Sequence, residues 1–497
     1  MSQRSRYCYG VPVSIRHRLL AALAITLVSR SVGAGPLDDA HVADTGFSGP
    51  TTGDLTAVYW NPAALGLIQG PQLMIGGAWQ STSVSVARTS IDPTTGSNPG
   101  STTFPTASGS GTLQPFRWPP GPSGFLGIGA GFGRSFAIAL AMYSPFSSKL
   151  TMNPTSDGQE PTRYHLVSME LNHTAVAIGL AIHASDSIQF GVAPGALFPS
   201  AHLVFDEETA LGAYREDPTS AARFDLATRG FQFLPSYFLA FGAHYRHGRF
   251  DLGLSYTTAP LGNGGSVTLP LDNTQITLPT SLGQGASLCP SNSTGNCLVG
   301  QMIYRLPSTY NLGATWQATP HWSATGIVRW VRNGAHDKIT ILIANPTSQT
   351  LLGSTVPDHV VLYRGFQDSL DLRGRVVYAT KQFRVGGTLR LETSAVPASH
   401  VNAAAIDGLK LEPSLAVEMR IWRQIRMSAG YAFTYMFPVH TGTSVFDPTA
   451  ASNCTAAGGD LSTSACQARR DGQARPSAAG TYHLWRQTLT VLTTIAF

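Results

Sequence analysis

The sequence contains fourteen runs with β-strand character, and the connections between them alternate between very short and long. This rhythm is typical of a closed antiparallel barrel in an outer membrane, which has tight turns on one side and long loops on the other. The expected strands span residues 72–88, 123–133, 135–150, 162–184, 187–206, 228–246, 249–269, 301–318, 321–344, 358–379, 382–395, 408–422, 425–440 and 481–497.

Alternation within these runs separates an apolar face from a polar one. In 425–440, Met427, Tyr431 and Phe433 share one face, whereas Ser428 and Thr434 share the other. Many runs exceed ten residues, whereas strands of soluble sheets average about 5–6. Aromatic residues also gather near strand ends, as the girdles at membrane interfaces do. We therefore expect an all-β, transmembrane antiparallel barrel of about 14 strands in the outer membrane of a Gram-negative bacterium.

The first 34 residues resemble a secretory signal, with five arginines, an apolar stretch at 19–28 and small residues ending at Ala34. We expect cleavage after Ala34. Without those five arginines, 28 Lys and Arg remain of 33, against 28 Asp and Glu, so the mature charge is balanced. The basic isoelectric point therefore gives no reason to expect a nucleic-acid partner. No later stretch has the ~18–20 apolar residues of a membrane helix.

Four cysteines remain after the signal, in two local pairs within Ser-, Thr- and Gly-rich connections. The pairs are Cys289 with Cys297 and Cys454 with Cys466. An exported protein favours disulfides, and neither spacing is that of a zinc site, although a metal site is the alternative. The sequence contains no metalloprotease, serine-hydrolase or P-loop motif. We expect no enzyme activity, no metal and no cofactor.

Several segments, in order, resemble the FadL/TodX family of outer-membrane transporters for long-chain fatty acids and other hydrophobic compounds. They are Tyr59-Trp60-Asn61-Pro62-Ala63, 139–146, Leu234-Pro235-Ser236-Tyr237 with 251–256, 306–313 and 427–433. The resemblance implies that residues 35–71 form a hatch inside the lumen and that 72–497 form the barrel. It also implies passive uptake, with capture outside, transfer to an internal pocket, a hatch shift and lateral exit through the wall.

Two candidate sites follow from this resemblance. Asn61, Pro62 and Ala63 are the candidate hatch or gate, because Pro62 fixes its own φ and Asn61 can form an Asx turn. A plain turn leading to the first strand is the alternative. Ser144, Pro145 and Phe146 are the candidate kink of the third strand, because proline cannot donate to a β-ladder. The alternative is that this strand simply ends at Tyr143.

Charged residues gather on neighbouring C-terminal strands. We expect them to face inward, because each would cost ~2–4 kcal/mol on the lipid face at the bilayer midplane. They could hold the hatch, meet a carboxylate head group, or form a self-neutralising wall of the lumen. These residues are Asp371, Arg373, Arg375, Arg384, Arg390, Glu392, Glu418 and Arg420.

The expected partners are a hydrophobic small molecule, outer-membrane lipid and the barrel-assembly machinery, with the barrel itself a monomer. The last run places Leu489, Val491, Ile495 and Phe497 on one face, interrupted only by Thr493, and ends on Phe497, which resembles the signal that the assembly machinery recognises. The alternative functions are a porin for small polar solutes and a surface adhesion or structural barrel.

Overall fold

The computed structural model describes most of the chain after the first 45 residues. The described residues are 46–89, 106–113, 124–133, 135–154, 160–208, 221–228, 235–271, 273–277, 300–343, 350–351, 354–355, 359–460 and 462–497. The expected signal peptide and the cysteine pair at 289 and 297 lie outside them.

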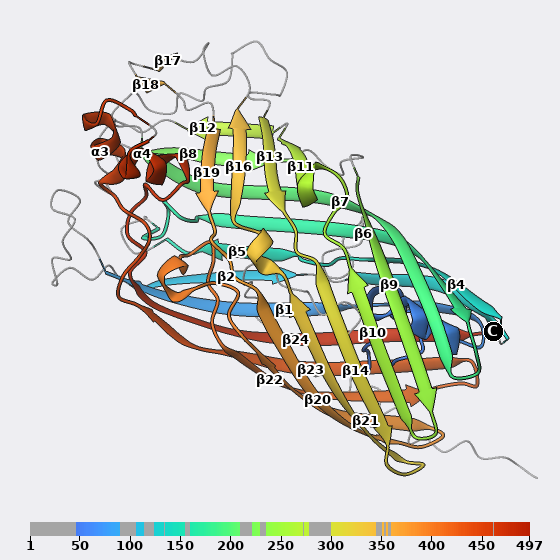
Figure 1. Cartoon of the computed structure of the whole chain (residues 1–497). Helices are drawn as coiled ribbons and strands as arrows, with labels where there is room; N and C mark the ends of the chain where they lie inside the picture. Colours follow the sequence, from blue (N-terminus) through green and yellow to red (C-terminus); the bar gives the residue numbers. More distant parts are fainter. Residues whose placement is uncertain are drawn as a thin grey trace, which may run out of the picture. The chain divides into compact units, whose positions relative to one another are not determined.

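Fourteen antiparallel strands form one closed ring, as the sequence predicts. Most of them follow one another directly around the ring (Figure 1). Their bounds are β1 Gly70–Arg88, β3 Gly124–Phe132, β4 Phe136–Tyr143, β6 Ser168–His183, β7 Ile188–Glu208, β9 Ser236–His247, β10 Phe250–Thr257, β14 Thr309–Gln317, β15 Trp322–Val331, β20 Ser369–Ala379, β21 Phe383–Glu392, β22 Lys410–Arg420, β23 Ile425–Thr441 and β24 Gly480–Ala496.

The ring closes where the first strand meets the last. β1 and β24 pair without interruption from Gln72↔Ala496 to Arg88↔Gly480. This closure matters because lipid offers no hydrogen-bond partner to a free strand edge. The tight turns lie at one end of the ring, which we call the turn end, and the longer connections lie at the other, the loop end (Figure 1).

The outer face of the ring is apolar, and the predicted alternation is confirmed on the strands where it was read. Leu415 is 69% exposed and Leu254 54% exposed, whereas their inward neighbours Ala416 and Ser255 are buried. Aromatic rings mark both borders of this face. Tyr310 stacks on Tyr256 and on Trp330 toward the loop end, and Trp322 packs against Tyr378 at the turn end. These are the girdles expected of a membrane barrel.

Four of the expected strands are shorter in the ring than predicted, because each is interrupted. The runs 249–269, 301–318, 321–344 and 358–379 each divide between a ring strand and a strand of a separate sheet. Glycines with positive φ at 262, 264 and 265 and the proline Pro307 lie at two of these breaks. The separate sheet, called the second sheet below, contains β11 Ser266–Leu271, β13 Gly300–Arg305, β16 Lys338–Ile343 and β19 His359–Tyr363.

Short strands also pair beyond the ring, mostly in segments where the sequence predicts long connections. β8 (Ala221–Ala227) pairs with β7 and with β12 (Asn273–Thr277). β2 (Ala107–Leu113) pairs with β1 and with β5 (Ser148–Met152), and β17 (Thr350–Leu351) pairs with β18 (Ser354–Thr355). Single-turn 3-10 helices occupy η3 Asn263–Gly265, η5 Asn333–Ala335 and η7 Ala398–His400.

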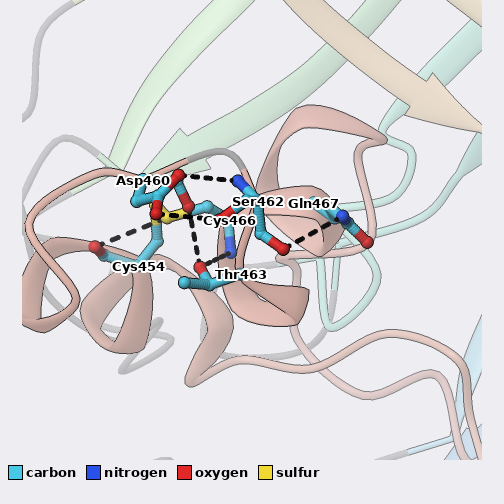
Figure 2. The surroundings of a disulfide bond; sticks show 6 residues. All are labelled: Cys454, Asp460, Ser462, Thr463, Cys466 and Gln467. Carbon is cyan, nitrogen blue, oxygen red and sulfur yellow. Dashed lines mark hydrogen bonds between the residues drawn. A yellow bond between two sulfur atoms is a disulfide. The ribbon is translucent and has the colours of Figure 1, made fainter.

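The last long connection contains two short helices, α3 (Ala450–Ala456) and α4 (Ser464–Arg470). A disulfide between Cys454 and Cys466 joins them, which confirms the predicted pairing (Figure 2). Thr463 caps α4 by accepting a hydrogen bond from the backbone N–H of Cys466, and Ser462 is held by the Asp460 carboxylate. Of the helices in the described parts of the chain, none has the length and apolar character needed to cross a membrane.

An outward charge should destabilise this barrel according to its depth. We expect Leu254→Arg, between the two aromatic borders, to lower the free energy of unfolding in lipid vesicles by about 2–4 kcal/mol. The matched control is His247→Arg at the turn end, which should cost about 0–1 kcal/mol. Urea titration followed by tryptophan fluorescence measures both values. Equal costs would contradict the assignment of the outer face to lipid.

Candidate functional site

The segment before β1 lies inside the ring, toward its turn end (Figure 1). It consists of a loop from Gly46, the helix α2 (Ala57–Trp60) and the 3-10 helix η2 (Pro62–Leu67). η2 packs against β6, β7 and β9, and Leu55, Val58 and Leu65 are fully buried. We call residues 46–69 the hatch. The described part of the predicted hatch region therefore occupies the lumen.

The turn Asn61-Pro62-Ala63 joins the two helices of the hatch and is fully buried. The Asn61 carbonyl Oδ1 accepts from the Ala63 N–H at 3.2 Å, which forms an Asx turn, and Pro62 occupies the first turn of η2. The Asn61 amide donates to the carbonyl of Pro50 at 2.8 Å and to that of Ala243, on β9, at 3.1 Å. Asn61 thus ties the hatch to itself and to the wall.

Glycines on the inner wall make room for this turn. A Cβ atom at Gly242 would collide with the Asn61 side chain, one at Gly191 with the backbone of Pro62 and Ala63, and one at Gly253 with the Pro50 carbonyl. Gly191 pairs directly with Gly242 across β7 and β9. Close approach of two backbones requires the absence of side chains, so these glycines form a seat shaped for the hatch.

Polar groups of the wall also bind the hatch backbone. Ser255 donates to the Trp60 carbonyl at 2.6 Å, and Asn311 donates to the same oxygen and to Ser255 Oγ. Arg375 donates through Nη1 to the carbonyls of Gly46 and Ser48 at 3.1 and 2.9 Å. These bonds satisfy hatch carbonyls that would otherwise be buried without donors.

Three further arginines face aromatic rings of the hatch. Arg373 lies 5.0 Å from the Trp60 ring centre, Arg329 lies 5.5 Å from those of Trp60 and Tyr59, and Arg384 lies 4.7 Å from that of Phe47. Contacts of this kind contribute about 0.5–2 kcal/mol each. The basic side chains of the wall therefore contact the hatch through its aromatic rings as well as through its carbonyl groups.

The remaining inward charges form a buried network on β20, β21 and β22. Asp371 accepts from Arg373 at 2.7 Å and from Arg390 at 2.9 Å, and Arg390 continues to Glu392 at 2.7 Å. The network extends to Glu412, which the alternation of its strand places inward, and to Lys410 and Asp407, which sequence reasoning missed. Arg384 pairs separately with Glu418 at 2.6 Å.

Arg420 is exposed, eight positions along β22 from Glu412, and has no part in the ion-pair network of the described residues. A cavity of about 30 Å³ lies between the hatch at Gly46 and Ser48 and the side chains of Arg375 and Arg390. That space is large enough to hold water beside the hatch.

The third strand is interrupted at residues 144–147. β4 ends at Tyr143 and β5 begins at Ser148, and both pair with β6. Tyr143 faces Ala175 and Ser148 faces Leu171, so five steps along this strand oppose four along β6, which is the count of a β-bulge. Regular pairing therefore stops after Tyr143 and resumes at Ser148.

The kink, residues 144–147, departs from the alternation of a lipid-facing wall. Ser144, Pro145 and Ser147 are all buried, and among the described non-glycine residues Phe146 alone has a positive φ, at 53°. On its other side, β4 pairs with β3 up to Tyr143, and β5 meets β2 only at Thr151 and Met152. The hatch lies beside the kink, because the ring of Tyr59 packs edge-on against that of Tyr143, with 5.3 Å between the ring centres.

A fourteen-stranded membrane barrel whose lumen holds its own N-terminal hatch defines a class of outer-membrane transport protein. The family profile described as "Outer membrane protein transport protein (OMPP1/FadL/TodX)" matches residues 40–436, most of the chain. The chain belongs to this family. No curated protein matches its sequence.

Solved structures share the fold at low sequence identity. A FadL homologue of Pseudomonas aeruginosa is 13% identical with a TM-score of 0.66, and the alignment covers 94% of this chain and 100% of that one. The Pseudomonas putida toluene transporter TodX is 14% identical with a TM-score of 0.59, covering 94% and 99%. The Ralstonia pickettii toluene transporter TbuX is 13% identical with a TM-score of 0.55, covering 95% and 100%.

Filling the glycine seat should loosen the hatch. We expect Gly242→Ala to cost about 1–3 kcal/mol, because a buried methyl group displaces the Asn61 turn. The control is Gly326→Ala on β15, where a Cβ atom would meet nothing within 4 Å. Limited proteolysis of residues 46–69 and the urea midpoint measure the effect. If both variants behaved alike, the seat would have no role in holding the hatch.

Proposed function

We propose that this protein takes up long-chain fatty acids or other hydrophobic compounds passively across the outer membrane, without enzymatic chemistry. Membership of the transport family and the likeness to two toluene transporters support the substrate class. The observation that carries the proposal is a single connected cluster of buried apolar side chains. It runs from the second sheet through the loop end of the lumen to the hatch and the kink.

The composition of this cluster suits a hydrocarbon. Leu269, Met302 and Leu362 belong to the second sheet, and Leu171, Phe205 and Phe224 line the ring and the β8 hairpin. Leu55 and Val58 of the hatch and Tyr143 beside the kink complete it. Each methylene moved from water into such surroundings gains about 0.8 kcal/mol. A ligand can therefore follow apolar contacts instead of a water-filled pore.

The kink supplies the exit in this proposal. The hatch blocks the straight path toward the turn end, with Asn61, Pro62 and Ala63 seated against the wall. Beside it, the third strand leaves its regular pairing at residues 144–147. A ligand displaced sideways there would reach the outer leaflet without crossing the hatch. The charged wall lies on other strands and serves chiefly to hold the hatch.

The partners follow from the same arrangement. The apolar outer face would contact outer-membrane lipid, and the closed ring leaves no strand edge that requires a second copy, so we propose a monomer. The last strand, β24, with the exposed Phe497 that follows it, would be the segment engaged by the barrel-assembly machinery.

Removing the bulge tests the lateral exit. Deleting Phe146 gives four steps opposite four on β6, so the strand can pair evenly and close the wall. We expect uptake of labelled oleate or labelled toluene into proteoliposomes to fall to the level of empty liposomes. The control is Phe146→Gly, which keeps the bulge and suits a positive φ, and should retain uptake.

Conductance recordings in planar bilayers separate the alternatives. A steady large ion current without uptake of either probe would favour a porin for polar solutes. Electrically silent liposomes that take up neither probe would favour an adhesion or structural barrel. Unchanged uptake after deletion of Phe146, in a barrel that still folds, would exclude the exit at this strand.

A further inference from the structure

His173 lies on β6 opposite the kink and is fully buried. Its Nδ1 is 2.8 Å from the carbonyl oxygen of Phe146, and its backbone N–H donates to Ser147 Oγ at 3.3 Å. Two consecutive residues of the kink are therefore held by one residue of the neighbouring strand. These bonds replace the regular ladder that the bulge interrupts.

The other ring nitrogen of His173 reaches a different part of the molecule. Its Nε2 is 2.7 Å from the hydroxyl of Tyr304, which is 2% exposed and belongs to β13 of the second sheet. The imidazole of His173 thus connects the kink to the second sheet. In the described parts of the chain, that sheet forms no strand pairing with the barrel.

Hydrogen-bond chemistry fixes the direction of this chain. A carbonyl oxygen only accepts, so Nδ1 carries the proton and donates to Phe146. A neutral ring then has Nε2 as its acceptor, and the Tyr304 hydroxyl donates to it. Tyr304 does not rotate freely, because the ring of His336 packs edge-on against it at 6.0 Å and His336 Nδ1 bonds the Arg305 carbonyl at 2.6 Å.

The kink needs such support. Phe146 adopts a left-handed backbone conformation that side chains other than glycine rarely take, and such residues persist only when their surroundings hold them. Its ring packs against the apolar cluster, and its carbonyl is bound by His173. The link from Tyr304 sets the orientation of the imidazole, and hence of its Nδ1 donor.

We propose that His173 is a positioning residue that couples the second sheet to the kink through Tyr304. A displacement of β13, such as a ligand entering the apolar cluster would cause, then breaks the Tyr304–His173 bond and frees the kink. Binding at the loop end is thereby communicated to the wall beside the hatch. The transport role of this coupling rests on the proposed function, whereas the coupling itself does not.

Hydrogen exchange of the full-length protein in lipid nanodiscs tests the coupling without any ligand. Tyr304→Phe keeps the ring and removes the hydroxyl. We expect amide exchange of residues 143–148 to become about two- to tenfold faster, the effect of one lost buried hydrogen bond. The matched control is Tyr482→Phe, where the buried hydroxyl donates instead to the Ala478 carbonyl at 2.6 Å and exchange at 143–148 should not change.

His173→Asn separates the two ends of the chain. The Asn side-chain amide can still donate to the Phe146 carbonyl but is too short to reach Tyr304. Amide exchange at residues 143–148 should therefore be as fast in His173→Asn as in Tyr304→Phe, and no faster in the double variant. If Tyr304→Phe left exchange at 143–148 as in the wild type, or if Tyr482→Phe accelerated it equally, the coupling would be wrong. Uptake of labelled oleate reports separately on the proposed function, since exchange needs no transport.

Discussion

The structure depends on one constraint, which is that backbone hydrogen bonds cannot be left open in lipid. The unbroken register of β1 with β24 meets this constraint by closing the ring. The same constraint applies to the third strand, where regular backbone pairing is interrupted. Where its ladder fails at residues 144–147, side chains take over, and His173 binds both the Phe146 carbonyl and, through its backbone, the Ser147 hydroxyl. An interruption supported in this way is a built feature of the wall.

Apolar and charged surfaces have different roles in the interior. Glycines and a few polar groups on β7, β9 and β10 receive the hatch, and arginines on β15, β20 and β21 contact its carbonyls and rings. Asp371 on β20 neutralises Arg373, and Glu418 on β22 neutralises Arg384. Burying such charges is tolerable only because they are paired, and the pairing leaves the rest of the lumen free to be apolar.

Much of the fold was predictable because strand alternation and turn rhythm are local signals. The sequence predicted the ring, its outward residues such as Leu415 and Met427, and the Cys454–Cys466 pair. It missed the division of four long strands, since a break at Pro307 reads locally as continuing alternation. It also missed His173, Tyr304 and Lys410, because their partners are distant in the chain and meet only when the ring closes. Glycines on three consecutive strands of the ring, Gly191, Gly242 and Gly253, were the available signal for the hatch seat.

The location of a bound hydrocarbon tests the account most directly. A structure determined by cryo-electron microscopy in lipid nanodiscs with oleate, or with a brominated hydrocarbon, would show where ligand density lies. The account predicts density within the apolar cluster, ending beside Tyr143 and the kink and outside the hatch seat. Density that follows the charged wall past a displaced hatch, or a continuous water-filled channel along the barrel axis, would contradict it.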